Sequence, residues 1–427
     1  MHRFFVAVLI LLSAVLALVP AIAQDAEIVL DFYYPVQVGG SVADVMQRYA
    51  DSFTEQFPNV RINVIYTGNY RQNEETIYTE LQGGGSGPHV SIMGANHAYR
   101  LGDMGAIVPV QDFISAEGDV EAFLSQYVPA FLDYDPEGTL WSLPFQRSTI
   151  ILYYNKDLFV AAGLNPEQPP RNREELVEYA RALTTDDVWG LGMPTANGWM
   201  IQPFAIGAGD PIWSGDPLNV NFNAPGVVEA AEFMSALIND YRVQSPDMMS
   251  YGDVSQEFIS GEIAMVLHST GAMTNHIENA PFEVGVGFVP AAPAGEDGTG
   301  YVTVTGGANL FVFNRGSEAE QQAAWEWVKF LTSAESQAIW GVETGYIAAN
   351  LGSWETTTLR DYLVERPQYG VALAQLEFAY PQMSAYVFDV NFIMDEALQR
   401  IIIEGVDAQE ALDEAQRLAD SLLAAYR

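Results

Sequence analysis

The chain has 427 residues, of which 49% are hydrophobic and 12% aromatic, so the composition favours a folded protein over disorder, and two domains or one split domain are expected. Its net charge of −37 disfavours nucleic acid and anionic membranes as partners. The absence of cysteine excludes disulfides, thiolate metal sites, a cysteine nucleophile and a lipid-bearing cysteine.

Residues 1–23 have the pattern of a secretory signal peptide. His2 and Arg3 precede an apolar run over 4–19, and Ala21-Ile22-Ala23 is typical of a cleavage site. A membrane anchor is the alternative, but the run is short and no basic cluster follows it. We therefore expect a periplasmic protein that is free after cleavage.

The next segments alternate between strand and helix patterns. Apolar residues alternate over 28–34, follow helical spacing over 42–57 and alternate again over 60–66. A strand, a helix and a second strand in this order form a parallel pair with a right-handed crossover, which predicts an α/β protein.

The rest of the chain continues this alternation. Short apolar runs predict core strands at 90–93, 150–154, 263–267 and 309–313. Helical spacing predicts helices at 71–82, 174–183, 227–241, 318–331 and after 407. Because no exposed linker separates two consecutive halves, we expect two lobes built from non-consecutive segments.

Motifs of catalysis are missing. None of the five histidines belongs to an H-E-x-x-H pair, and there is no G-x-S-x-G sequence. The glycines of 83–87 lack the lysine of a phosphate-binding loop, so they predict a turn. With 55 acidic residues, no carboxylate pair stands out. A secreted glycoside hydrolase and an adhesion or scaffold protein remain alternatives to a binding protein.

Polar and aromatic residues gather at the predicted strand ends and tight turns. They occur at 66–70, 94–97, 146–149, 198–199, 268–271, 305–309 and 344–346. Ligands of open α/β sheets bind at strand ends, and aromatic rings with neutral hydrogen-bonding groups suit a sugar or polyol. This pattern predicts a cleft for a small polar molecule.

Several of these segments resemble one protein family. The segments are YTGNYRQN at 66–73, LPFQRSTIILYYNKD at 143–157, AGLNPEQPP at 162–170, AMVLHSTG at 264–271, GGANLFV at 306–312 and ETGYIAA at 343–349. On these segments the chain resembles the extracellular solute-binding proteins (family 1) of ABC importers. The resemblance implies the periplasmic-binding-protein type II fold, with two α/β lobes, a hinge and a ligand cleft between the lobes.

The resemblance also implies boundaries and partners. The N-terminal lobe is expected at 26–138 and 285–316, and the C-terminal lobe at 139–284 and 317–427. A monomer of this kind binds a small solute and delivers it to the transmembrane subunits of an ABC permease. It is not an enzyme and uses no cofactor or metal.

The family's ligand contacts map onto particular residues of this sequence. Together with the polar residues beside them, they predict a binding set of Tyr70, Asn96, Gln146, Arg147, Ser148, Trp199, Ser269, Thr270, Gly306, Gly307, Tyr346 and Asn391. Tyr70 and Gly307 are expected on one lobe, and Trp199 and Tyr346 on the other.

Two departures bear on the solute. Where the family's phosphate-binding members have a glutamate, this sequence has Ala95, beside Asn96. Where those members have an arginine, this sequence has Asn391. Loss of that arginine favours a neutral sugar or polyol over glycerol-3-phosphate or a glycerophosphodiester, which stay the alternative. Arg147 either restores a positive charge in the cleft or pairs with an acidic residue.

Overall fold

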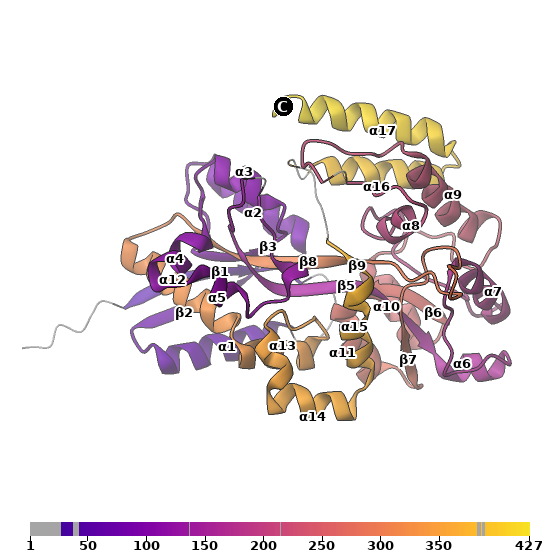
Figure 1. Ribbon diagram of the computed structural model, residues 1–427, viewed down its shortest axis with the longest axis horizontal. Coiled ribbons are helices and arrows are strands. Elements are labelled where there is room, and N and C mark those ends of the chain that lie inside the picture. Colours follow the sequence, from indigo (N-terminus) through magenta and orange to yellow (C-terminus); the bar gives the residue numbers. More distant parts are fainter. Residues whose placement is uncertain (1–26, 37–41, 136, 214, 382–385, 387–388) are drawn as a thin grey trace, which may run out of the picture.

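A computed structural model describes residues 27–36, 42–135, 137–213, 215–381, 386 and 389–427. The signal peptide predicted at 1–23 lies outside the described residues. Two lobes lie on either side of a central pair of long strands (Figure 1). We call the part that packs around β1 the first lobe and the part that packs around α9 the second lobe.

The first lobe opens with the predicted parallel pair. β1 (Ile28–Tyr34) and β2 (Val60–Tyr66) are joined by α1 (Val42–Gln56) and pair in parallel over seven residues. The other elements of this lobe are β3 (Val90–Met93), β4 (Ile107–Val108), α2 (Tyr70–Gln82), α3 (His97–Asp103), α4 (Val110–Glu117), α5 (Val120–Leu124), the 3-10 turn η1 (Pro129–Phe131) and α12 (Glu318–Leu331).

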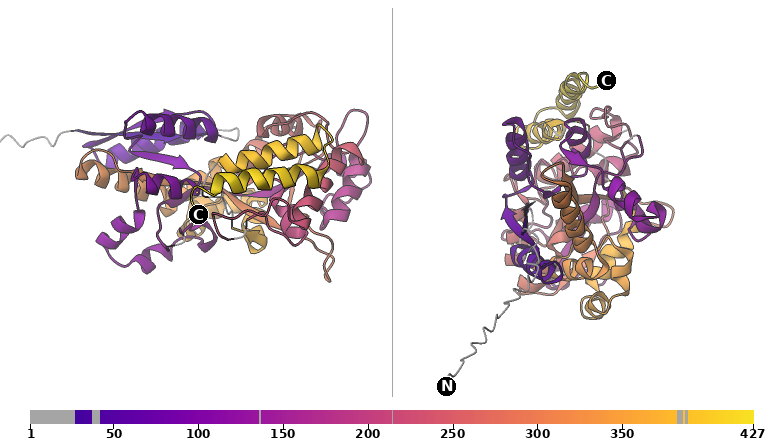
Figure 2. Two further views of the ribbon diagram at one scale, coloured as in Figure 1. Left: turned by 90° about the horizontal axis from the view of Figure 1, so that it is seen from above. Right: turned by 90° about the vertical axis from the view of Figure 1, so that its left-hand side faces the viewer.

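The second lobe is mainly helical around two short strands, β6 (Met265–Ser269) and β7 (Val284–Gly287). Its helices are α6 (Lys156–Ala161), α7 (Arg173–Leu183), α8 (Gln202–Gly207), α9 (Pro225–Asn239), α10 (Tyr251–Ser260), η2 (Thr270–Ala272), α11 (Met273–Asn279), α16 (Asp389–Ile402) and α17 (Ala408–Leu423). The last two helices lie side by side along one face (Figure 2).

A third group of elements follows α12 in the chain. It consists of α13 (Ala334–Thr344), η3 (Leu351–Glu355), α14 (Thr357–Glu365), α15 (Gln368–Ala374), η4 (Gln375–Phe378) and β9 (Ala379–Tyr380).

Two long strands carry the chain between the lobes. Among the described residues the sheet has the order β2-β1-β3-β8-β5-β6, with β4 and β9 paired to β8 and β7 paired to β5. β5 (Leu143–Asn155) is buried along its whole length. Its first half, to Thr149, pairs with β8 (Thr303–Phe313), and its second half, from Ile150, pairs with β6 and β7. The polar stretch 146–149 therefore lies where β5 changes partners.

The packing of two regions differs from the predicted lobe boundaries, which otherwise stay a prediction. Leu143 and Phe145 belong to the core cluster around β1, although the sequence assigned them to the second lobe. Helix α12 was also assigned to the second lobe, but its Trp325 and Trp327 are fully buried in the core cluster around β1. The apolar face of α12 must pack against a hydrophobic core, but nothing local in the sequence indicates which lobe that core belongs to.

Candidate functional site: a cleft between the lobes

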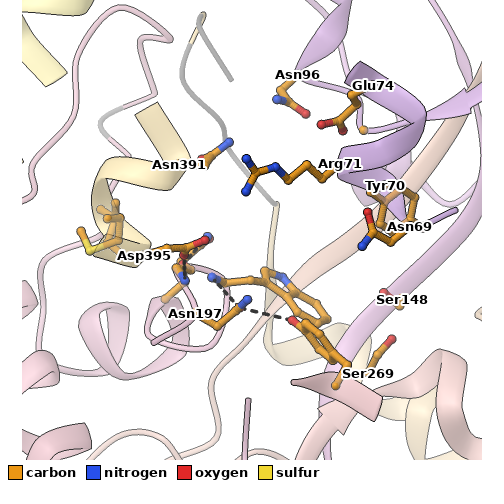
Figure 3. A pocket seen from close by; sticks show the side chains of 18 of the residues that line it. Asn69, Tyr70, Arg71, Glu74, Asn96, Ser148, Asn197, Ser269, Asn391 and Asp395 are labelled. Carbon is orange, nitrogen blue, oxygen red and sulfur yellow. Dashed lines mark hydrogen bonds between the residues drawn. The ribbon is translucent and has the colours of Figure 1, made fainter. Parts of the chain in front are cut away.

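A cavity of about 310 Å³ lies between the two lobes. Side chains from both lobes face one another across it (Figure 3). The first lobe contributes Asn69, Tyr70, Arg71, Glu74, Gly94 and Asn96, and α16 contributes Asn391, Met394 and Asp395. Its size and lining are those of a site for a small molecule.

The first turn of α2 forms one wall. The Asn69 side chain accepts from the Gln72 backbone N–H at 3.0 Å, and the Gln72 side chain accepts from the Asn69 N–H at 3.0 Å. This capping box begins the helix at Tyr70, so the side chains of its first turns are held at the cavity.

The carboxylate of Glu74 is buried beneath this wall. Its Oε1 lies 2.8 Å from Nε2 of His97, which is also buried. Its Oε2 has no hydrogen-bond partner among the described residues. A buried acceptor without a partner is unfavourable, so Glu74 offers this oxygen to a hydroxyl or N–H group in the cavity.

Arg71 reaches across the cavity from α2. Its guanidinium lies 4.8 Å from the centre of the Phe392 ring on α16, and Figure 3 shows it pointing toward Asn391. Its Nε donates to Oε1 of Glu75 at 2.8 Å, and its side chain is 64% exposed. Arg71 thus connects the two walls, and its charge is partly neutralised by its neighbour.

The loop 197–199 forms the opposite wall. Asn197 Oδ1 accepts from the backbone N–H of Trp199 at 3.1 Å and from the Tyr251 hydroxyl at 3.2 Å. The Trp199 indole donates from Nε1 to the Thr305 carbonyl on β8 at 3.1 Å. These bonds fix the indole plane at the cavity surface, where it can stack on an apolar face of a ligand.

Asp395 closes this wall from α16. Its Oδ1 accepts from the Gly198 N–H at 2.6 Å. Burial raises the pKa of Asp395 to about 6, although the bond from Gly198 acts in the opposite direction. Asp395 is therefore the acid of the cleft whose charge changes near neutral pH.

The floor of the cavity is formed by strand ends and by two tyrosines, of which Tyr346 is buried and Tyr70 is partly buried. Ser148 on β5, Ser269 at the end of β6 and Gly307 on β8 line it. Burial raises the pKa of Tyr346 to about 12, and burial together with Tyr346 raises the pKa of Tyr70 well above its ordinary value. Both tyrosines therefore stay neutral and act as hydroxyl groups.

The structure brings most of the predicted binding set together at this cavity. The residues that line it are Tyr70, Asn96, Ser148, Trp199, Ser269, Gly307, Tyr346 and Asn391. One detail differs: Tyr346 packs in the core cluster around β1 and not in the second lobe. It stacks on Trp340 at 5.6 Å, and this contact holds it on the same side as Tyr70.

Four predicted residues do not line the cavity. Gln146 and Thr270 are buried, and Thr270 Oγ1 accepts from the Thr149 N–H at 3.3 Å. Gly306 lies behind the Trp199 indole. Gln146 and Thr270 therefore lie within the core, and only Gly306 lies directly behind a side chain of the wall.

Arg147 is the fourth, and the structure decides between its two expected roles. Its Nη1 donates to Asp133 Oδ2 and to Asn309 Oδ1, both at 2.9 Å. It lies 1% exposed beside a neighbouring cavity. Successive residues of β5 point to opposite faces, so Arg147 faces away from the cleft that Ser148 lines.

Sequence reasoning missed several lining residues. Glu74 lies one helical turn after Tyr70, so the (i, i+4) spacing was a usable signal. Asn197 adjoins Gly198, which was singled out, and Asp395 lies one helical turn after Asn391 on α16. Nothing in the sequence pointed to Tyr251 or Trp213, which tertiary packing alone brings to the cavity.

The described residues contain neither a candidate metal site nor a candidate membrane-spanning helix. No group of three or more His, Asp or Glu side chains in them is arranged to hold a metal ion. Over the same ranges, no helix has the length and apolar character needed to cross a bilayer.

Comparison with known proteins identifies the family. Residues 48–362, about three quarters of the chain, match the profile of the bacterial extracellular solute-binding proteins. The chain belongs to this family. The solute-binding protein is 28% identical to the sn-glycerol-3-phosphate-binding periplasmic protein UgpB of Pectobacterium atrosepticum, over 95% of this chain and 94% of the relative. It is also 28% identical to UgpB of Escherichia coli K12, with 96% of each chain covered.

Solved structures agree on the fold. UgpB from Mycobacterium tuberculosis in complex with glycerophosphocholine has a TM-score of 0.81 and 23% identity, covering 93% of this chain and 98% of its own. The maltose/maltodextrin-binding domain MalE from Bdellovibrio bacteriovorus bound to maltotriose has a TM-score of 0.80 and 18% identity, covering 93% and 100%. The expected periplasmic-binding-protein fold is thus confirmed.

The family defines the general role of the solute-binding protein. It is the periplasmic component of an ABC importer that binds a small solute and delivers it to the permease. Its family and relatives are transport proteins and not enzymes.

Proposed function

We propose that the protein captures a neutral sugar or polyol by closing its two lobes around it. The observation that carries this proposal is the charge of the cleft. The charged side chains that line it, within the described residues, are Arg71, Glu74 and Asp395, so acids outnumber bases. Since Glu75 already binds Arg71, a phosphate dianion would enter a site with an excess of negative charge.

The uncharged lining supports the same solute. Five amide side chains line the cavity, namely Asn69, Asn96, Asn197, Gln202 and Asn391. Each amide offers a donor and an acceptor, which matches a hydroxyl group. The rings of Trp199, Trp213 and Tyr251 offer apolar faces for C–H groups.

Closure of the lobes follows from the two-sided lining. A ligand shifts an open–closed equilibrium only by its difference in affinity for the two states. A solute that contacts Tyr70 on the first lobe and Trp199 or Asp395 on the second makes its full set of contacts only in the closed state. The closed form then presents the solute to the permease.

A glycerophosphodiester is the second candidate. The relatives named above are sn-glycerol-3-phosphate-binding proteins, and Arg71 lies at the cavity, at the N-terminus of α2. A diester carries a single negative charge, which one arginine and a helix N-terminus can accommodate. A positively charged headgroup would in turn suit Asp395 and the aromatic rings.

Calorimetric titration of the mature protein separates the candidates. The panel contains glucose, maltose, maltotriose, glycerol, glycerol-3-phosphate and glycerophosphocholine. We expect a saccharide to bind most tightly and to raise the free energy of unfolding by about 2.7 kcal/mol at 100 times its Kd. Tightest binding of glycerol-3-phosphate or glycerophosphocholine overturns the proposal. Chromatography of the bound sugar after incubation should recover it intact, whereas hydrolysis products would indicate a glycosidase.

A further inference from the structure

Two buried polar residues of the first lobe form a pair beside the cleft. Glu74 on α2 is 5% exposed, and His97 at the start of α3 is 1% exposed. Nε2 of His97 lies 2.8 Å from Oε1 of Glu74. Oε2 of Glu74 has no hydrogen-bond partner among the described residues, and Glu74 lines the cleft. One carboxylate oxygen is therefore engaged inside the lobe, and the other is left for a solute.

The other side of the His97 ring is held as well. Its Nδ1 lies 3.0 Å from the hydroxyl of Tyr78, which follows Glu74 by one turn on α2. The two rings have centroids 5.7 Å apart, and the Arg100 guanidinium lies 4.4 Å from the centre of the Tyr78 ring. A carboxylate has acceptors only, so the Nε2 that faces Glu74 carries the ring hydrogen and Nδ1 can accept from Tyr78. Contacts at both nitrogens thus fix the imidazole and, through it, the Glu74 carboxylate.

Asn96 adds a donor to the same wall. It directly precedes His97 and lines the cleft, and its buried Nδ2 has no hydrogen-bond partner in the described part of the chain. Figure 3 shows Asn96 and Glu74 both on the side of the cavity opposite Asp395. A hydroxyl group donates and accepts, so hydroxyl groups can satisfy both residues. An ionised phosphate or carboxylate accepts only, so it would leave Oε2 of Glu74 unpaired.

The charge of Glu74 adds to this preference. Two like charges repel more strongly beside buried groups than in bulk water. Arg71 also lines this wall, but its side chain is 64% exposed and its Nε donates to Glu75. An anion in the cleft would therefore be repelled by Glu74 with only partial compensation from Arg71.

We propose that Glu74 selects hydroxyl-bearing solutes against anions, and that His97 is the positioning residue that holds Glu74 in this orientation. This inference rests on the proposed function, because it names the residues that make the cleft specific for a neutral solute. His97 does not line the cavity, so it acts through Oε1 of Glu74 and leaves Oε2 to the solute. Tyr78 in turn fixes the His97 ring.

Pairs of solutes that differ in charge test the selectivity. The pairs are glucose with glucuronate, maltose with maltobionate, and glycerol with glycerol-3-phosphate, measured by calorimetric titration. Glu74→Gln removes the charge and keeps the shape, so affinity for the neutral member should fall about tenfold and affinity for the anion should rise about tenfold. Glu80→Gln is the matched control, because it removes one charge from the same helix without lining the cavity. Its affinities should stay within about twofold of the wild type.

A double-mutant cycle tests the positioning role. His97→Leu leaves Oε1 of Glu74 without its neighbour, so affinity for the neutral solute should fall about tenfold. The same change in the Glu74→Gln background should cost less than about twofold, because the residue through which His97 acts is already altered. His97→Gln keeps a side-chain N–H donor and should restore most of the affinity. A merely structural role would instead weaken neutral and anionic solutes alike in both backgrounds.

Urea unfolding checks that each variant is folded. If His97→Leu does not fold, Tyr78→Phe takes its place, because it removes only the hydroxyl that faces Nδ1. We then expect a loss of about threefold for the neutral solute and none for the anion. An equal loss for both solutes, or no loss for either, would overturn the positioning role.

Each result of the titrations has a definite meaning. Opposite changes within a pair for Glu74→Gln, together with the coupling to His97, support the inference. A Glu74→Gln variant that keeps the wild-type preference overturns the selectivity, and equal losses from His97→Leu in both backgrounds overturn the positioning role. Either of these results leaves the proposed function standing. Failure of every neutral probe to bind the wild type, or tightest binding of an anion, overturns both.

Discussion

Gly306 offers a sharp test of how Trp199 is held in the cleft. The glycine lies on β8 directly behind the indole, and a Cβ at this position would lie 2.4 Å from Cζ2 and 2.7 Å from Cε2 of Trp199. Because carbon atoms pack at about 3.5–4.0 Å, the indole of a Gly306→Ala variant must move by about 1 Å toward the cavity. Nε1 then loses its 3.1 Å bond to the Thr305 carbonyl.

The expected effects follow from this displacement. Overpacking of a well-packed site lowers the free energy of unfolding by about 1–3 kcal/mol. The displaced indole also occupies ligand space, so affinity for the best solute should fall by about tenfold, or about 1.4 kcal/mol. Urea unfolding measures the first quantity and calorimetric titration the second.

A double-mutant cycle isolates the cause. The smaller ring of a Trp199→Phe variant leaves room for the new methyl group, so Gly306→Ala should cost much less in that background. We expect a coupling free energy of about 1 kcal/mol or more between the two positions. If Gly306→Ala left both stability and affinity unchanged, the indole could not be packed as described and the reasoning would be refuted.

Three further predictions concern the same cleft. Gly307→Ala should prevent stable folding, because φ is +90° and the new Cβ would lie 1.7 Å from a backbone carbonyl oxygen of β5. Gly84→Ala is the matched control: its φ is +83° but nothing lies within 4 Å of the new Cβ, so the free energy of unfolding should fall by only about 1–2 kcal/mol. Equal losses for the two variants in urea unfolding would contradict this. The pKa of Asp395 is about 6 in the folded state and about 3.9 in the unfolded state, so the folded state binds more protons between these two pH values. The protonated Asp395 side chain therefore contributes to stability below about pH 4, and this contribution is lost by about pH 6.5. Asp395→Asn should flatten this pH dependence by about 2–3 kcal/mol in urea unfolding, and an identical pH profile would refute the shift. Trp199→Ala should weaken solute binding by about 1–3 kcal/mol in calorimetry, whereas unchanged affinity would exclude stacking on this ring.

The fold class and the order of elements could be read from the sequence because they depend on local patterns. Alternation over 28–34 and 60–66 with helical spacing between them led to the parallel pair of β1 and β2. Most of the predicted binding set lines the cavity, because side chains at strand ends and in the loops beside them meet at one edge of the sheet. Tyr70, Ser269 and Trp199 are examples at the cavity.

The direction in which a side chain points was harder to obtain. Arg147 and Ser148 are neighbours in the sequence, and both were predicted as polar binding residues at the start of a strand. The pleat of β5 directs Ser148 to the cleft and Arg147 to a neighbouring cavity, and a bulge between Pro144 and Gln146 shifts the local register.

The amino-acid sequence alone determined that this chain forms an α/β protein with a polar cleft, since hydrophobic periodicity and turn residues act over a few positions at a time. Only the tertiary structure decided that Tyr346 and α12 pack with the first lobe, that Tyr251 and Asp395 reach the cleft, and that Arg147 faces a second cavity. Most of these arrangements depend on contacts between residues far apart in the chain, such as Gly198 with Asp395 and Arg147 with Asn309, for which one sequence holds no local signal.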